Sequence, residues 1–373
     1  MNYTRFILKS ILKNKINLLI LTVIPILSIL FLYINNNAQK SDNIGYYANR
    51  DYNFNKKAIK YMSLHKNKFN ANELDAIPSY IYSQKTNYKI LQSIKSDNWA
   101  KAYDNQKKLN NYMNAEGTPG WEVHILKRNN MLMDYLNKHN IKNPESESYP
   151  THNLTFNVWI NNFIVPVTLS IIAIFIASNL FCNDYRKGIH IGRLLTTSLN
   201  EQFIIQISIS SIFLYAYYLL VNLFNIIISS ESIGTIGFNY PYYVHQNGSM
   251  GYIDLSKIYS SMYPMQLINI IFIVSFIYLI SRFTKKKINT IFFSLFLIIA
   301  PSILVNIYYM PKIIYKYIPG TYLDTVGIVS GNSAKILNNV STHTGIIVVL
   351  IYTTIIWMII IFKNLVEERR NTL

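Results

Sequence analysis

The sequence is short of charge and almost without cysteine. Only 14% of its 373 residues are charged and 51% are hydrophobic, whereas about 25% of the residues in an average soluble domain are charged. Long uncharged runs accompany this deficit, and the combination indicates an integral membrane protein. The single cysteine, Cys182, excludes a disulfide within the chain, so any large region outside the membrane must be held together by packing.

The common catalytic motifs are missing as well. No G-x-x-x-x-G-K-[ST] sequence occurs, so we do not expect the chain to hydrolyse ATP itself. The seven histidines are scattered and form neither H-E-x-x-H nor a Cys/His cluster, which argues against a metal site. There is no G-x-S-x-G nucleophile elbow either. We therefore expect no enzymatic activity, no metal and no cofactor in this chain.

The chain is strongly basic, with a net charge of +17. Such a charge can indicate nucleic-acid binding. Here the basic residues are spread over segments that flank apolar runs and over one large polar region, and no zinc-finger or RNA-binding motif accompanies them. We expect no nucleic-acid partner. Abundant Asn, Ile, Lys and Tyr are typical of an AT-rich bacterial genome.

Six apolar runs are long enough to cross a bilayer as helices. They are residues 16–34, 158–181, 203–229, 264–280, 288–309 and 345–362. None contains Asp, Glu, Lys, Arg or His, whereas proton- and ion-coupled transporters usually keep ionisable groups there, so a self-powered pump is disfavoured. The Asn, Gln, Ser and Thr residues of the runs either form hydrogen bonds between helices or line a polar path for a substrate.

Lys and Arg gather on one side of these spans, which predicts that side to be cytoplasmic. Both termini, the loop 183–202 and the turn 281–287 carry them. Both termini are thus predicted to be cytoplasmic, and the polar insertion 35–157 to lie outside. Its apolar residues recur with a helical period, and they form either its core or a surface for a substrate or partner. The predicted fold class is an all-α integral membrane protein. It has six transmembrane helices, a large, mainly helical extracytoplasmic domain between the first and second, and a five-helix region at 158–373.

Residues 1–15 have the pattern of an amphipathic helix. Three cations, spaced four residues apart, form one stripe: Arg5, Lys9 and Lys13. Four apolar residues lie off this stripe: Phe6, Ile7, Ile11 and Leu12. The pattern predicts a helix in the membrane interface, with its cations on lipid headgroups. The alternative is a basic flank that only orients the first span.

The polar loop 183–202 separates the second and third spans. Its charged residues are Asp184, Arg186, Lys187, Arg193 and Glu201. Four apolar residues would give a short helix at the membrane face an apolar side: Ile189, Ile191, Leu194 and Leu195. Such a helix would dock into a groove on a soluble partner. The loop is otherwise a basic connector that fixes the topology.

The order of residues in this loop resembles the cytoplasmic loop after the second span of type-2 ABC exporter permeases, the membrane-spanning subunits of ATP-binding cassette transporters. The matching residues are Gly188, Leu194, Leu195, Thr196 and Thr197. Ser198 stands where the family often has proline, and no threonine directly follows Gly188. Residues 318–323, which include Pro319 and Tyr322, are similar to the Pro-aromatic segment that re-enters the outer leaflet before the last span of these permeases.

The resemblance implies a permease subunit in a bacterial cytoplasmic membrane. It would pair with a second copy or a paralogue and be driven by separate ATPase subunits, which would bind the ATP and Mg²⁺. Loop 183–202 would be the ATPase-coupling contact. The exported cargo would be a hydrophobic or amphipathic compound such as an antimicrobial peptide, a drug or a lipid. The alternative function is a membrane-anchored sensor or assembly scaffold whose helical extracellular domain binds a ligand.

Overall fold

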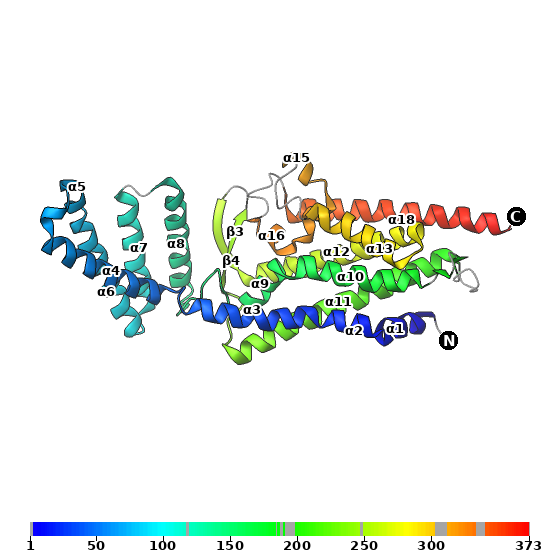
Figure 1. Ribbon diagram of the computed structural model, residues 1–373, viewed down its shortest axis with the longest axis horizontal. Coiled ribbons are helices and arrows are strands. Elements are labelled where there is room, and N and C mark those ends of the chain that lie inside the picture. Colours follow the sequence, from blue (N-terminus) through cyan, green and yellow to red (C-terminus); the bar gives the residue numbers. More distant parts are fainter. Residues whose placement is uncertain are drawn as a thin grey trace.

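The computed structural model describes residues 3–116, 119–183, 185–186, 189–190, 198–246, 249–302, 312–332 and 340–372. The molecule is elongated, with a helical arm at one end of its long axis and a bundle of long helices along the rest (Figure 1). Both termini lie at the end of the bundle away from the arm. The arm is inserted into the chain between the first bundle helices and the remaining ones.

The chain begins with helices α1 (Tyr3–Lys13), α2 (Lys15–Leu21) and α3 (Val23–Gln39). The side chain of Asn14 caps α2 by accepting a hydrogen bond from the backbone N–H of Ile16 at 3.0 Å. Pro25 explains why α2 ends at Leu21. A proline ring clashes with the carbonyl four residues earlier and supplies no N–H to it. The predicted first span is therefore two helices.

The arm consists of α4 (Ile44–Leu64), α5 (Ala71–Leu74), α6 (Ile77–Lys95), α7 (Trp99–Ala115) and α8 (Gly120–Lys138), with a short 3₁₀ turn at Lys66–Lys68. Asparagine side chains cap the starts of α4, α5 and α7, which is where their short polar groups are favoured. Two small clusters hold the arm together. Their buried members are Ala48, Ile90, Ala102 and Leu109 in one, and Tyr103, Met133 and Leu136 in the other.

The bundle contains α9 (Asn153–Phe163), α10 (Val165–Cys182), α11 (Leu199–Ser232), α12 (Leu255–Thr284), α13 (Lys287–Ser294) with the π-helix η3 (Leu295–Ile299), and α18 (Thr342–Thr372). In the described part of the chain, five helical stretches are long and apolar enough to cross a membrane. They are Lys15–Leu64, Val165–Cys182, Leu199–Ser232, Leu255–Thr284 and Thr342–Arg369. These helices support the predicted class, a mainly helical multi-pass membrane protein. The predicted span 288–309 is described only to residue 302, as a shorter apolar helix.

Two span boundaries differ from the sequence prediction. The second span is interrupted at Ile164, where α9 ends and α10 begins, because Pro166 cannot continue the hydrogen-bond ladder to residue 162. The fourth span begins nine residues earlier than predicted, at Leu255, and Pro264 lies inside α12. Tyr259 and Met262, which precede that proline in the helix, are buried in a core cluster. Packing of this kind keeps proline-containing helices intact in membranes.

A β-hairpin lies in the segment between the predicted third and fourth spans. Strands β3 (Pro241–Gln246) and β4 (Ser249–Asp254) pair antiparallel, with Tyr242 opposite Ile253 and Tyr243 opposite Tyr252. Aromatic and β-branched residues favour such pairing, and Asn-Gly at 247–248 is a strong hairpin signal in the sequence. The hairpin contacts α8 and the start of α12, so it lies between the arm and the bundle (Figure 1).

Buried amides join three helices inside the bundle. The Asn157 side chain donates to the Asn222 Oδ1 at 2.8 Å and to the Tyr259 hydroxyl at 3.0 Å. Asn161 donates to the same Asn222 oxygen at 2.7 Å, and Asn225 donates to Asn157 Oδ1 at 3.3 Å. These residues come from α9, α11 and α12. The amides thus form interhelical hydrogen bonds, one of the two roles that the sequence left open for them.

Candidate functional site

Glu201, at the end of the loop 183–202, belongs to the cap of α11. The backbone N–H of Glu201 donates to Ser198 Oγ at 3.2 Å, and the backbone N–H of Ser198 donates to Glu201 Oε2 at 3.1 Å. This reciprocal pair is a capping box, whose sequence signal is Ser-x-x-Glu before an apolar run. The cap fixes the residue at which the loop ends and the long helix begins.

The first turn of α11 is also bonded to α18. The backbone N–H of Leu199 donates to Glu368 Oε1 at 2.9 Å, and Asn364 Nδ2 donates to Asn200 Oδ1 at 2.9 Å. The carboxylate of Glu368 satisfies one of the N–H groups that a helix start leaves without an internal partner. A negative charge is also favoured at that end of the helix dipole. The exit of the loop is thereby tied to the C-terminal helix.

Arg282 brings the end of α12 into the same arrangement. Its side chain is 2% exposed and its Nη2 donates to Asn364 Oδ1 at 2.9 Å and to Glu367 Oε2 at 2.7 Å. A buried guanidinium is tolerated when it is paired in this way. Lys363 Nζ donates to the Arg282 carbonyl at 3.0 Å. We call Asn200, Arg282, Asn364, Glu367 and Glu368 the loop-side frame, because together they hold α11, α12 and α18 where the loop ends.

The sequence-predicted coupling residues are only partly described. Asp184, Lys187, Gly188, Arg193, Leu194, Leu195, Thr196 and Thr197 lie outside the described residues. Arg186 lies in strand β1 (Tyr185–Arg186), which pairs with β2 (Ile189–His190). The predicted helix is therefore wrong for the four residues of these two strands. Tyr185 and Ile189 are of the aromatic and β-branched types that favour extended pairing. The frame was missed, although Arg282 and the Ser-x-x-Glu pattern were visible in the sequence.

The three N-terminal cations share one exposed side of α1. Arg5, Lys9 and Lys13 are exposed, whereas Ile7 and Ile11 are each 1% exposed and belong to the main core. Helix α1 contacts α10 and α11, so its apolar side packs against the bundle. The amphipathic pattern is present, and contact of the cations with lipid headgroups stays a prediction.

Pro319 and Tyr322 lie in a short buried segment between α12 and α18. The segment comprises the 3₁₀ helix η4 (Pro319–Leu323) and α16 (Thr325–Val329). Tyr322 is fully buried, its hydroxyl donates to the Lys316 carbonyl at 2.8 Å, and its own carbonyl accepts from Asn269 Nδ2 at 2.7 Å. A Cβ on Gly345 of α18 would lie 2.4 Å from the Tyr322 ring, so the close approach of α18 requires glycine there.

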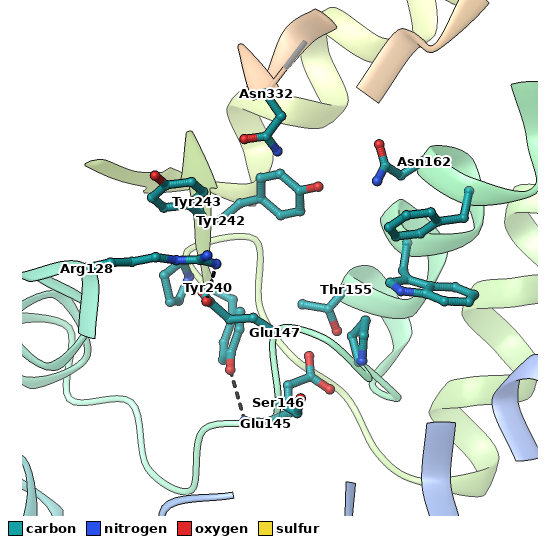
Figure 2. A pocket seen from close by; sticks show the side chains of 14 residues that line it. Arg128, Glu145, Ser146, Glu147, Thr155, Asn162, Tyr240, Tyr242, Tyr243 and Asn332 are labelled. Atoms are coloured by element: carbon teal, nitrogen blue, oxygen red, sulfur yellow. Dashed lines mark hydrogen bonds and ion pairs between the residues drawn. The ribbon is translucent and has the colours of Figure 1, made fainter. Parts of the chain in front are cut away.

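A cavity of about 180 Å³ lies at the other end of the bundle, at the base of the arm. Helix α8, the connection 139–152, α9 and β3 surround it (Figure 2). Its lining includes Arg128, Glu145, Glu147, Trp159, Phe163, Tyr240, Tyr242 and Tyr243. The connection is anchored to the end of α3, because Thr151 Oγ1 donates to Gln39 Oε1 at 2.6 Å and Asn35 Nδ2 donates to the Pro150 carbonyl at 3.0 Å. We call this space the arm-base cavity.

The two carboxylates of the cavity wall have different partners. Arg128 forms an ion pair with Glu147, and its guanidinium carbon lies 4.0 Å from the centre of the Tyr243 ring. The side chain of Glu145 is 2% exposed, and its Oε2 accepts from the backbone N–H groups of Thr151 at 2.8 Å and His152 at 3.1 Å. Nδ1 of His152 lies 2.9 Å from the same oxygen. The second carboxylate oxygen, Oε1, is buried and has no hydrogen-bond partner.

The protonation of the wall follows from burial and from these neighbours. Burial disfavours the charged form of Arg128, but the Glu147 carboxylate and the Tyr252 hydroxyl outweigh it, and the pKa of Arg128 is raised. Burial, together with the charges of Glu145 and Glu147, raises the pKa of Tyr240 well above its ordinary value. At neutral pH the wall therefore presents a charged guanidinium and an un-ionised Tyr240 phenol beside the carboxyl groups.

In the described residues, no group of three or more His, Cys, Asp or Glu side chains could hold a metal ion. Comparisons with protein-family models, curated proteins and solved structures found no match to this chain.

Proposed function

We propose that this chain is the membrane-spanning permease subunit of an ABC exporter, with both termini and the loop 183–202 on the cytoplasmic side and the arm outside. The observation that carries the proposal is the loop-side frame. The loop ends at α11, which is hydrogen-bonded to α18 through Glu368 and Asn364. Helix α18 is in turn hydrogen-bonded to α12 through Arg282. A force on the loop would therefore move α11, α12 and α18 together.

The driving energy would come from a separate ATPase subunit that contacts the loop. ATP binding would close two ATPases beneath two permease copies, or beneath this chain and a paralogue. Nucleotide can favour one permease conformation only by binding more tightly to the complex in that conformation. The buried pairing of Arg282 with Glu367 supports this scheme, since a rigid junction transmits displacement with little local rearrangement.

The cargo in this proposal is a hydrophobic or amphipathic compound, such as an antimicrobial peptide, a drug or a lipid. Two features support it. The bundle carries many exposed apolar side chains, among them Leu220 and Phe362, so lipid-dissolved compounds have access to it. The amides of Asn157, Asn161 and Asn222 are hydrogen-bonded to one another, which disfavours a path for small ions through that cluster.

Co-purification from the native host tests the proposal. We would tag the chain, extract it gently and identify bound proteins by mass spectrometry, for the wild type and for Leu194→Asp. Lys286→Asp, in the turn between α12 and α13, is the matched control. We expect an ATPase subunit that is lost with Leu194→Asp and kept with Lys286→Asp. Absence of any ATPase, under conditions that preserve a known transporter, would refute the permease function.

A second candidate function is a membrane-anchored sensor or assembly scaffold. The arm-base cavity favours it, because a cavity between an arm and a bundle could report a bound ligand by shifting the arm. A sensor without an output domain of its own needs a signalling partner. In the same experiment, recovery of a kinase and no ATPase would replace the permease function with this one.

A further inference from the structure

The arm-base cavity combines one unpaired buried carboxylate oxygen with aromatic walls. Oε1 of Glu145 has no hydrogen-bond partner although its side chain is 2% exposed. A buried polar atom without a partner is costly, and an ionised one is more so. Figure 2 shows the Glu145 carboxyl group beside Thr155, within the ring of side chains that line the cavity. A ligand with a hydrogen-bond donor would satisfy this oxygen.

The charges on the cavity lining favour a positively charged hydrogen-bond donor on the ligand. Arg128 is already paired with Glu147 and covered by the Tyr243 ring, so its charge is largely compensated. Glu145 interacts with backbone N–H groups and with His152 through its other oxygen only. Carboxylates outnumber cations on the lining. An ammonium group offers the charge-assisted hydrogen bond that a carboxylate favours, and the faces of tyrosine and tryptophan rings attract cations as well.

The apolar part of the cavity lining favours a ligand with an apolar tail. Trp159 and Phe163 line the cavity from α9, and their ring centres are 5.1 Å apart. Phe163 is 60% exposed on the outside of the bundle, so the cavity borders a surface that we expect to contact lipid. A volume of about 180 Å³ is close to that of an engineered cavity of about 150 Å³ that admits benzene. It therefore suits a headgroup and a few carbon atoms, and it is too small for a folded peptide.

We propose that the arm-base cavity is a binding site for amphipathic amines. The ammonium group donates to Glu145 Oε1 and lies among the tyrosine rings, while the alkyl chain passes along Trp159 and Phe163 toward the lipid. The proposal goes beyond the permease function, because binding of the amine requires neither an ATPase nor transport.

Isothermal titration of the full-length chain in nanodiscs tests the site, with empty nanodiscs as the reference for partitioning into lipid. The probes are n-octylammonium, n-octanol and n-octanoate, which share one chain and differ in headgroup charge. We expect saturable binding of n-octylammonium, and affinities at least about tenfold weaker for the alcohol and the carboxylate. No saturable heat above empty nanodiscs, or equal binding of n-octanol, would overturn the proposal. This charge series uses the wild-type protein and does not depend on the folding of any variant.

Two substitutions then locate the site. Glu145→Gln should weaken n-octylammonium binding at least about tenfold, whereas Glu116→Gln, an exposed carboxylate on the arm, should leave it unchanged. We expect n-octylammonium to bind the wild type more tightly than n-butylammonium does. Phe163→Ala should reduce this difference in affinity. Wild-type affinity in a Glu145→Gln protein that keeps its thermal transition would overturn the assignment to Glu145. Because the purified chain is titrated alone, loss of ATPase co-purification and loss of amine binding are separate results.

Discussion

The two ends of the bundle place buried charges in opposite ways. At the loop-side frame, Arg282 donates to both Asn364 and Glu367, and Glu368 accepts from the start of α11. At the arm-base cavity, Glu145 keeps one buried oxygen without a partner beside an open space. Arg282 Nε also lacks a hydrogen-bond partner, but the other contacts of the frame lock its helices together. An unsatisfied group next to a cavity is instead available to a ligand. We therefore assign rigidity to the first end and binding to the second.

The largest expected effect is at the loop-side frame. Glu367→Ala removes the carboxylate partner of buried Arg282 and should cost about 3 kcal/mol, the lower end of the range for breaking a buried pair, because Glu367 is itself 22% exposed. Thermal denaturation in detergent measures the loss. Glu367→Gln, which keeps a hydrogen-bond acceptor, is the control and should lose less. Equal stability of Glu367→Ala and the wild type would show that the frame is not rigid.

A second test concerns the segment packed between α12 and α18. Gly345→Ala would place a methyl group 2.4 Å from the Tyr322 ring, and overpacking of this kind costs about 1–3 kcal/mol. Tyr322→Leu combined with Gly345→Ala should recover part of the loss, because the two positions share one contact. Strictly additive losses in thermal denaturation would argue against that contact.

A smaller effect is expected for the amides inside the bundle. Asn222→Leu removes the acceptor shared by Asn157 and Asn161, and it should cost about 1 kcal/mol, within the range measured for hydrogen bonds between membrane helices. Urea or detergent denaturation of the purified chain provides the measurement. Leu223→Ala, on an exposed face of the same helix, is the control. A stabilised Asn222→Leu protein would contradict a stabilising role for these hydrogen bonds.

The smallest effect on stability is expected at Arg128, the cation that is paired with Glu147 in the arm-base cavity. Arg128→Lys keeps the charge but loses the stacking on Tyr243 and the bond from Nε to the Tyr252 hydroxyl at 3.3 Å. The cost should be about 0.5–1 kcal/mol, as for a partly exposed cation–π contact, with amine binding nearly unchanged. Loss of most of the amine binding in a protein that keeps its stability would contradict the assignment of the ammonium group to Glu145.

The sequence predicted the helical membrane class because long uncharged runs admit few other structures. The sequence predicted the positions of helix ends less well. Pro166 was predicted to lie inside a span and Pro264 to begin one, yet a helix ends just before Pro166 and another runs through Pro264. Only tertiary packing distinguishes the two prolines. The hairpin at 241–254 was not predicted, although the Asn247-Gly248 sequence is typical of a hairpin turn.

The candidate sites were harder to predict for a physical reason. The loop-side frame joins residues more than 80 positions apart, such as Arg282 and Asn364, and the arm-base cavity joins α8 to α9 and β3. Such groups meet only through the fold. What the sequence could show was local, namely the Ser198–Glu201 cap and the stripe of Arg5, Lys9 and Lys13. The coupling role of Leu194 and its neighbours stays a prediction, since these residues lie outside the described part.

The most direct test of contact between the loop 183–202 and an ATPase subunit is a photo-cross-link from the loop in living cells. A photoreactive amino acid would replace Leu194, with the same group at Lys286 as the control, and cross-linked products would be identified by mass spectrometry. We predict a cross-link from position 194 to an ATPase subunit that is absent or much weaker from position 286. Cross-links from position 194 that reach only lipid, or only proteins of the outer surface, would contradict it.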